Sequence, residues 1–352
     1  MGLGDLHFIL PGDPETRTGG FIYDKRIIEA LTAAGVPVVR HCLPEGFPEP
    51  DQQTLEKTAA VLQGIGDGET VVIDGLAMGA IPALLRPHAE RLRLVALIHH
   101  ALADETGLSP QQQAALFDSE REALGLAKRV VTTSRHTAKR LAGFDVESER
   151  IAVVIPGAVP APLAEGSDGP GLQLLSVGGL IPRKGHALLI EALGHLTDRP
   201  WHLVCVGTTS RDPDAAAQVR EVIRQHALEQ RVDLVGELAP SELEAQYNRA
   251  DLFVLASYHE GYGMVFSEAI ARGLPIVATS GGAVPEAVPP EAAFLVPPGD
   301  ARGLAEALAS VMDDNGLRKR LAAGARRARG KLPRWADAAD RFIEALGLGH
   351  GR

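Results

Sequence analysis

Short runs of apolar and β-branched residues alternate along the whole chain with segments in which apolar residues recur every three or four positions. The runs predict strands and the periodic segments predict helices. Because few polar residues interrupt the runs, we expect parallel sheets covered by helices on both faces. The predicted strands are Leu6–Leu10, Thr70–Ile73, Leu92–Ile98, Val130–Thr133 and Ile151–Ile155, and then Leu172–Val177, Trp201–Val206, Val232–Val235, Leu252–Ala256, Ile276–Ala278 and Phe294–Val296.

One stretch breaks this alternation near the middle of the chain. The segment Pro156–Gly171 is rich in Pro, Gly and Ala, which is typical of a linker. We therefore expect two Rossmann-like, doubly wound domains, residues 1–160 and 161–334, facing one cleft. A final segment, 335–352, contains the amphipathic helix Trp335–Leu346. Open α/β sheets bind ligands beyond the carboxyl ends of their strands, so loops that follow strands are the first candidates for function.

Length, charge and cysteine content narrow the class of protein. A chain of 352 residues predicts two domains, and 35 basic against 45 acidic residues give a net charge of −10, which argues against a nucleic-acid binder. The two cysteines, Cys42 and Cys205, cannot form a disulfide framework, so a reducing compartment is expected. No apolar run reaches the roughly 18 residues of a membrane span. Met1–Leu10 lacks the basic residues with which a signal peptide begins, so we do not expect it to be one. We expect a cytoplasmic enzyme.

The segment Leu317–Lys331 is basic and rich in alanine. This pattern predicts a helix with a solvated face. A weak contact with an anionic or membrane surface is the alternative interpretation.

In each half of the chain, a glycine-containing loop follows the first predicted strand. Gly19 and Gly20 precede a helix expected from about Phe21, and a helix start preceded by glycines can bind an anion through free N–H groups. In the second half, Gly178–Gly185 carries Arg183 and Lys184 where the next helix begins. A cation there opposes the helix dipole unless an anion lies between them, so Lys184 is a candidate phosphate ligand.

The segment Leu252–Glu268 carries the most informative pattern. A buried strand leads to a polar loop with Glu260, and Gly261 and Gly263 then open a helix that contains Glu268. At the rim of the loop, Glu260 could accept hydrogen bonds from sugar hydroxyls, and Glu268 could bind the two vicinal hydroxyls of a ribose. Backbone N–H groups around Gly261–Val265 would face an anion.

This Glu-x7-Glu pair, together with the Gly178–Gly185 loop ending in Lys-Gly, resembles the retaining glycosyltransferases of family 4, which have the GT-B fold. The loops at Gly19–Gly20 and Thr279–Gly282, with Glu286, fit the same family, so the likeness covers nearly the whole chain. The resemblance implies a metal-independent retaining hexosyltransferase that moves a sugar from a UDP- or GDP-sugar to an acceptor hydroxyl. It also implies that residues 335–352 pack back on the N-terminal, acceptor-side domain and that 161–334 bind the donor.

The resemblance also assigns roles to individual residues. Lys184 would contact the donor diphosphate, with the backbone of Gly19 and Gly20 closing over it. His99, favoured over His100, would contact the sugar near the reaction centre. Glu260 would bind sugar hydroxyls and Glu268 the ribose; the residues that would line the pocket are Gly261, Tyr262, Gly263, Met264 and Val265.

The chain departs from the family pattern at Gly179, where the family often has an arginine. Either Arg183 supplies the second positive charge for the diphosphate, or Lys184 and backbone donors act alone. No metal or other cofactor is expected. The acceptor could be a small molecule, a glycan or a lipid, with a lean toward a small soluble compound, and the oligomeric state stays open.

Two short motifs and the overall architecture also allow other interpretations. His99, His100 and Asp104 spell the HHxxxD signature of peptide-synthetase condensation domains, but such domains do not show this strand–helix alternation. Asp212 and Asp214 form the Asp-x-Asp of metal-using glycosyltransferases, although an acid at a helix start favours a cap. A nucleotide-sugar epimerase, a sugar phosphorylase or a non-catalytic nucleotide-sugar binder would share the architecture.

Overall fold

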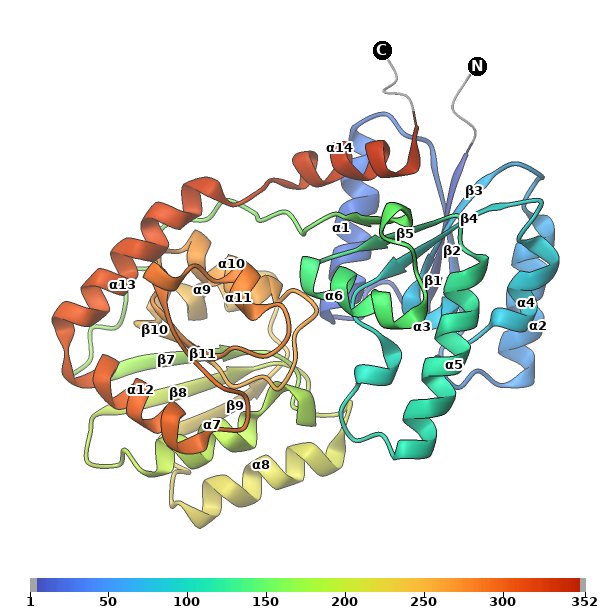
Figure 1. Ribbon diagram of the computed structural model, residues 1–352. Helices are drawn as coiled ribbons and strands as arrows, with labels where there is room; N and C mark the ends of the chain where they lie inside the picture. The colour runs from blue at the N-terminus through green and yellow to red at the C-terminus, as the bar shows by residue number, and fades with distance from the viewer. Residues whose placement is uncertain (1–4, 349–352) are drawn as a thin grey trace. The chain divides into compact units, whose positions relative to one another are not determined.

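The computed structural model describes residues 5–348, so the first residues of Met1–Leu10 and the last four of 335–352 lie outside the described residues. The chain divides into two compact units (Figure 1). Unit 1 comprises the chain up to Gly157 together with the part from Pro333 onward, and unit 2 comprises Ala158–Leu332.

Unit 1 contains one parallel sheet in the order β2-β1-β3-β4-β5-β6. Its strands are β1 Leu6–Pro11, β2 Val38–Leu43, β3 Thr70–Asp74, β4 Arg93–Ile98, β5 Arg129–Thr132 and β6 Ile151–Val153. Its helices are α1 Gly19–Ala33, α2 Gln52–Gly64, α3 Gly75–Met78, α4 Pro82–Leu85, α5 Pro110–Leu126, α6 Arg135–Arg140 and α14 Trp335–Leu346. The strand order reverses between β1 and β3, so ligands are expected where these two strands end.

Strand β2 is the element that the sequence pattern missed. It lies at the edge of the sheet and most of its residues are partly exposed, so Arg40 and His41 interrupt the apolar run. A short edge strand does not need the continuous hydrophobic pattern of a strand buried on both faces.

Helix α14 packs against α1 although the two are far apart in sequence (Figure 1). Phe342 is fully buried with its ring 5.8 Å from that of Phe8 in β1, and Trp335 lies edge-on to Tyr23 of α1 at 5.5 Å. The C-terminal helix therefore covers one face of the unit 1 sheet, while α2 to α5 contribute to the core on the other face.

Unit 2 contains a second parallel sheet in the order β12-β11-β10-β7-β8-β9, which is the Rossmann order. Its strands are β7 Leu172–Val177, β8 Trp201–Val206, β9 Val232–Gly236, β10 Leu252–Leu255, β11 Ile276–Thr279 and β12 Ala293–Val296. Its helices are α7 His186–Gly194, α8 Pro213–Gln225, α9 Pro240–Arg249, α10 Met264–Ala271, α11 Val284–Ala287, α12 Ala301–Asp313 and α13 Asn315–Ala328. The order reverses between β7 and β10.

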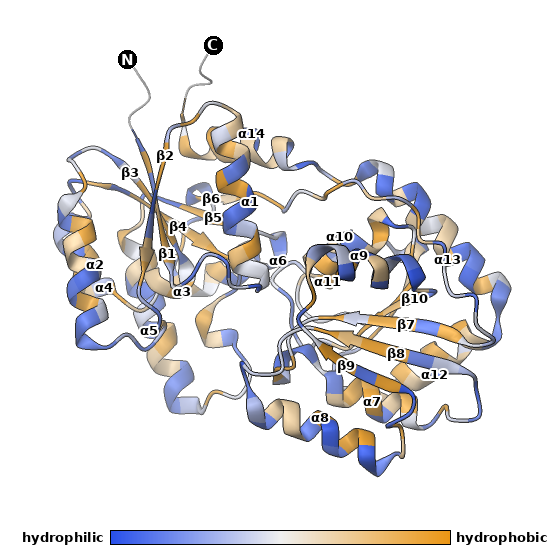
Figure 2. Cartoon of the chain, turned by 180° about the vertical axis from the view of Figure 1, so that it is seen from behind, coloured by the Kyte–Doolittle hydropathy of each residue, from blue (hydrophilic) through white to orange (hydrophobic). Residues whose placement is uncertain are grey.

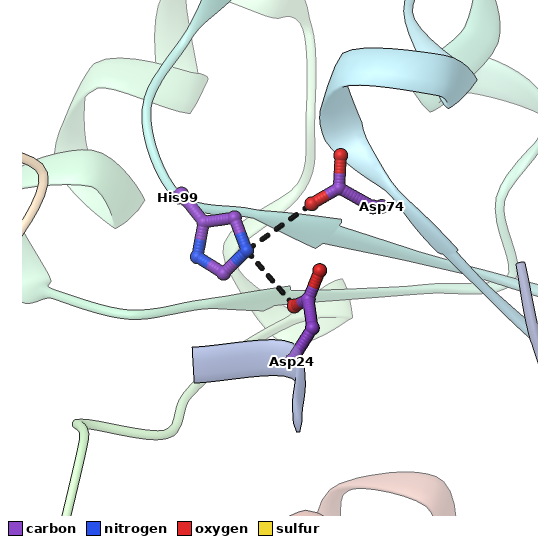
Figure 3. A group of neighbouring side chains, drawn as sticks. All are labelled: Asp24, Asp74 and His99. Carbon is purple, nitrogen blue, oxygen red and sulfur yellow. Dashed lines mark hydrogen bonds and ion pairs between the residues drawn. The ribbon is translucent and has the colours of Figure 1, made fainter. Parts of the chain in front are cut away.

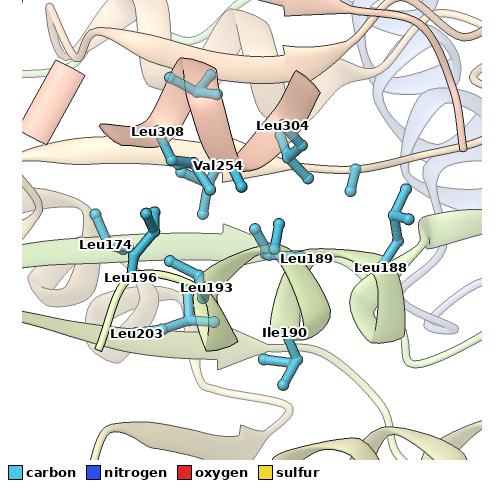
Figure 4. Packing of buried hydrophobic residues seen from close by; sticks show 14 of the residues in the cluster. Leu174, Leu188, Leu189, Ile190, Leu193, Leu196, Leu203, Val254, Leu304 and Leu308 are labelled. Carbon is cyan, nitrogen blue, oxygen red and sulfur yellow. The ribbon is translucent and has the colours of Figure 1, made fainter. Parts of the chain in front are cut away.

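Alternate residues of the unit 2 strands face different helices. Leu174 and Val254 pack with leucines of α7 and α12 in one large core (Figure 4). On the opposite face, Phe253 stacks against Tyr247 of α9 and lies edge-on to Phe266 of α10. Helix α7 is therefore rich in apolar residues, whereas α8 buries only one side and is amphipathic (Figure 2).

The chain between the units has no helix or strand from Val154 to Gly171, in agreement with the predicted linker. The basic segment forms α13 and a short 3-10 turn, Arg329–Lys331. Several of its cations have local partners: Arg318 donates to backbone carbonyls at the end of α12, and Arg329 donates to Ala161 O. Over residues 5–348, no helix combines the length and the apolar character needed to cross a membrane.

Candidate active site

The two loops expected to bind the donor meet at the point where the strand order of unit 2 reverses. The loop after β7 contains the 3-10 turn Pro182–Lys184, and the loop after the neighbouring β10 contains Glu260. The two loops are joined through the backbone, since the N–H of Tyr258 donates to Arg183 O at 2.8 Å. Parallel strands thus bring residues 76 positions apart in sequence to one place.

Lys184 and Glu260 form a close, shielded ion pair. Lys184 Nζ lies 2.7 Å from Glu260 Oε1 and 3.0 Å from Oε2, and the two side chains are only 15% and 5% exposed. Ser257 donates to Oε1 at 2.6 Å, and Arg183 Nη1 lies 3.8 Å from Oε2. The prediction that Glu260 lies at the rim of the loop is wrong, because the loop folds back and directs the carboxylate inward to these partners.

The charges in this cluster do not cancel. Burial on its own would raise the pKa of Glu260, but the charges of Lys184 and then Arg183 outweigh it and hold that pKa below its usual range. Glu260 is therefore ionised at neutral pH. With two cations and one carboxylate, the cluster carries one net positive charge, which suits an anionic ligand.

Two helices begin at this cluster with glycine in the left-handed conformation. Gly185 precedes α7 with φ of +64°, and Gly263 precedes α10 with φ of +87°. A Cβ atom at Gly185 would lie 2.0 Å from Ala256 O, so only glycine fits there. Neither cap gives a side-chain hydrogen bond to the helix start. Apart from the N–H of Phe266, which donates to Gly263 O at 2.9 Å, the first-turn N–H groups are thus left for other acceptors.

The remaining residues of the second loop take up defined positions. Gly261 and Tyr262 lie between Glu260 and the cap residue Gly263, and the Tyr262 side chain is largely buried. Met264 and Val265 are the first two residues of α10, so their N–H groups are among those without a helical partner.

Glu268 lies in the second turn of α10 and is held by a residue that does not belong to the Lys184–Glu260 cluster. Tyr247 of the neighbouring α9 donates its hydroxyl to Glu268 Oε2 at 2.8 Å. Burial, and then the Glu268 charge, raise the pKa of Tyr247, which keeps this donor protonated. The carboxylate is thus fixed in orientation by a tyrosine that the sequence pattern did not reveal.

Gly179, where the family often has an arginine, lies close to another loop. A Cβ atom there would come within 3.1 Å of Thr208 Cγ2. Arg183 instead brings its guanidinium to the Lys184–Glu260 pair and donates to His259 O at 2.9 Å. Of the two alternatives for the second positive charge, the geometry favours Arg183.

In unit 1, His99 lies directly after β4 and next to two carboxylates (Figure 3). Its Nε2 is 3.0 Å from Asp24 Oδ1 of α1 and 3.2 Å from Asp74 Oδ2 at the end of β3. Gly20 belongs to the same environment, since a Cβ there would lie 3.1 Å from His99 Cδ2. Helix α1 begins at Gly19 rather than near Phe21, because Thr18 caps it, so both glycines lie in its first turn.

The competing motifs have structural roles. Asp212 accepts a hydrogen bond from Ala215 N at 2.9 Å and caps α8, which confirms the cap interpretation. Asp104 makes a bidentate ion pair with Arg140, and His100 lies 3.3 Å from Glu105.

The sequence analysis missed Asp24, Asp74, Ser257 and His186. Asp74 directly follows the predicted strand Thr70–Ile73, which was an available signal, whereas Asp24 lies inside a helix and gave none. His186 opens α7 with both ring nitrogens buried and without a hydrogen-bond partner among the described residues. Burial, and then the Lys184 charge, lower its pKa to about 4, so the imidazole is neutral at pH 7.

Comparison with known proteins agrees with these observations. A family model described as glycosyl transferases group 1 matches residues 164–328. A D-inositol 3-phosphate glycosyltransferase of Corynebacterium efficiens is 30% identical over 248 residues, which is 65% of this chain and 58% of that protein. An MMP alpha-(1->4)-mannosyltransferase of Mycolicibacterium hassiacum is 27% identical over 315 residues, 85% of this chain and 75% of that protein. The chain covers 50–58% of the length of three D-inositol 3-phosphate glycosyltransferases, that of Corynebacterium efficiens included.

Solved structures show the same architecture. A sucrose-phosphate synthase from Thermosynechococcus elongatus superposes with a TM-score of 0.83 at 23% identity, covering 97% of both chains. Anabaena HepE in complex with UDP and glucose gives a TM-score of 0.75 at 19% identity, covering 98% of this chain and all of that one. The two Rossmann-like units therefore have the GT-B fold, and almost the whole of unit 2 matches glycosyl transferases group 1.

Proposed function

We propose that this protein is a glycosyltransferase that moves a hexose from a UDP- or GDP-sugar to an acceptor hydroxyl, with retention of configuration and without a metal ion. The observation that carries the proposal is the buried Lys184–Glu260 pair at the reversal point of a Rossmann sheet, between two glycine-capped helix starts. The match to glycosyl transferases group 1 supports it.

The diphosphate would bind at the positive cluster. Lys184 and Arg183 supply two cations against one carboxylate, and the starts of α7 and α10 supply N–H groups aimed outward. Donors fixed in advance stabilise the charge that develops on a leaving nucleoside diphosphate. Lys184, Arg183 and the N–H groups at the two helix starts would stabilise this charge, and for this reason we propose a reaction that needs no metal ion.

The structure changes the role proposed for Glu260. Its carboxylate is held by Lys184 and Ser257, so its first effect is to fix the ammonium group that faces the leaving group. A direct bond to sugar hydroxyls stays part of the proposal, with the sugar approaching over the backbone of Gly261–Val265. Glu268, oriented by Tyr247, would bind the two ribose hydroxyls.

We propose the chemical classes of the donor and the acceptor from those of related proteins. HepE was solved with UDP, with UDP and glucose, and with UDP-glucose, and these complexes favour a uridine donor. For the acceptor we propose a small hydroxyl compound, in line with the inositol phosphate in the relatives' names. The family resemblance assigns His99 a contact with the sugar and implies attack on the face from which the diphosphate leaves.

The experiment is a transfer assay with matched variants. UDP- and GDP-hexoses are incubated with a panel of small polyols and sugar phosphates, and products are measured by mass spectrometry and anomeric NMR. We expect an acceptor-dependent α-linked product from an α-linked donor and full activity in the presence of EDTA. Glu268→Gln should raise the KM for the donor, whereas Glu306→Gln, which changes an exposed acid of α12 in the same unit, should not. Conversion of the donor sugar without acceptor would instead indicate an epimerase and contradict the proposal.

A further inference from the structure

The carboxylates around His99 form the second polar cluster at a sheet reversal point. Asp24 lies on the helix after β1, Asp74 ends β3, and β1 and β3 are the strands between which the order of unit 1 reverses. Asp24 is 1% and Asp74 4% exposed, and Asp24 Oδ2 has no hydrogen-bond partner within the described residues. Burying two carboxylates is costly unless a cation compensates them.

His99 is the cation available to this pair. Both acids approach the same ring nitrogen, Nε2, and Figure 3 shows the other ring nitrogen on the side of the ring away from both carboxylates. The ring is confined by Gly20 and by the edge-on ring of Tyr23 at 5.2 Å. Its backbone is fixed as well, because Thr137 donates its hydroxyl to His99 O at 3.3 Å.

Two carboxylates have a different effect from one. A single acid fixes the tautomer of a neutral imidazole, which then presents a lone pair, as in a general base. Two acids on Nε2 favour the doubly protonated ring, which presents an N–H donor. Burial alone would lower the pKa of His99, but Asp24 and then Asp74 outweigh it and raise that pKa.

We propose that Asp24 and Asp74 are positioning residues that hold His99 as an imidazolium, with Nε2 bound inward and Nδ1–H presented to an oxygen atom of the substrate. This inference rests on the proposed glycosyl transfer, for which His99 would act as a fixed hydrogen-bond donor rather than as a base. Asp24 and Tyr23 from α1 and Asp74 from β3 are titratable groups that face the His99 ring, and the Thr137 hydroxyl of α6 binds the His99 carbonyl oxygen.

The first test observes the proton itself and needs no activity. Long-range 1H–15N NMR of the histidine rings reports the charge and tautomer of His99 between pH 6 and 9. We expect both His99 nitrogens to be protonated across this range in the wild type. In Asp74→Asn the pKa of the ring should fall, and we expect the ring to lose a proton within this pH range. The asparagine oxygen can still accept the N–H of Leu76 that Asp74 Oδ1 accepts at 2.8 Å, so the variant keeps this cap.

The second test measures catalysis as a function of pH. In Asp74→Asn and in Asp24→Asn, kcat should fall about 10- to 100-fold at pH 8 and recover toward low pH, where the ring regains its proton. The KM for the donor should change less than kcat, because the diphosphate and ribose contacts proposed for Lys184 and Glu268 lie in unit 2 and are untouched by these variants. The matched control is Glu105→Gln, which removes the carboxylate 3.3 Å from His100 and should leave the pH profile flat.

Several outcomes would overturn the inference. A neutral His99 in the wild type at pH 7.5, or unchanged pH profiles in both aspartate variants, would show that the acids do not set its charge. Because the three ligand atoms lie within 4.8 Å of one another, stoichiometric Zn²⁺ or Mn²⁺ binding that is lost in Asp24→Asn would reassign the cluster as a metal site. If no donor supports transfer while the NMR result holds, the proposed function fails and the protonation claim stands.

Discussion

The Lys184–Glu260 pair allows one prediction to be worked out in detail. Replacing Lys184 by methionine keeps the length of the side chain but leaves the Glu260 carboxylate, 5% exposed, with Ser257 at 2.6 Å and Arg183 at 3.8 Å. Breaking a buried pair by removing one partner typically costs about 3–5 kcal/mol. Because Arg183 compensates in part, we expect a loss of about 3 kcal/mol in the free energy of unfolding of unit 2, at the low end of that range.

The assay can be restricted to unit 2. The chain has two tryptophans, Trp335 in α14 of unit 1 and the buried Trp201 in β8 of unit 2. In a Trp335→Phe background, the fluorescence of Trp201 therefore reports urea unfolding of unit 2. With a denaturant slope of about 2–3 kcal/mol per M, the midpoint should fall by roughly 1–1.5 M.

Further variants separate pairing from other effects. Adding Glu260→Gln to Lys184→Met should recover part of the loss, because the unpaired charge is removed. The control is Arg302→Met, which breaks an ion pair whose side chains are 90% and 67% exposed and should leave the midpoint unchanged. If Lys184→Met shifts the midpoint no more than this control, the pair is not buried in solution and the reasoning is refuted.

Three further predictions concern single positions. Gly185→Ala should lower the free energy of unfolding by about 1–3 kcal/mol and weaken nucleotide binding, because φ is +64° and the new Cβ would meet a carbonyl oxygen. Calorimetry measures both effects, and Gly330→Ala, which has open space around it, is the control. Asp212→Ala should lower the free energy of unfolding by about 1 kcal/mol through loss of the α8 cap, and should leave the rate of transfer unchanged even with chelator present. Burial raises the pKa of Glu120 to about 8, above its value in the unfolded chain, so the folded wild type loses stability as the pH rises toward 8. Glu120→Gln removes this titration and should raise the thermal midpoint relative to wild type at pH 9 but not at pH 4.

The sheets were largely predictable because their strands are buried on both faces. Runs such as Leu172–Val177 and Trp201–Val206 match the observed strands residue for residue. Strand β2 was missed for the opposite reason: at the edge of its sheet, Arg40 and His41 meet solvent and break the apolar pattern. The fold therefore follows from hydrophobic patterning except where an element is only half-buried.

The residues of the proposed donor site could be selected from the sequence, but their contacts could not. Glycine-containing loops that follow strands singled out Lys184 and Glu260, yet nothing local to Glu260 indicated that its carboxylate would turn inward to Lys184 and Ser257. The Asp24–His99–Asp74 cluster was harder to predict still, since it joins a helix residue, the last residue of β3 and the residue that follows β4. Such long-range pairing is decided by tertiary packing, which a single sequence does not display.

The most direct test of the central claim is a crystal structure of the protein with a bound UDP-hexose or GDP-hexose. The account predicts the diphosphate within about 3 Å of Lys184 Nζ and of first-turn N–H groups of α7 or α10, with both ribose hydroxyls on Glu268. A nucleotide sugar bound at any other place in unit 2, or bound there with Lys184 and Glu268 turned away from it, would contradict the account.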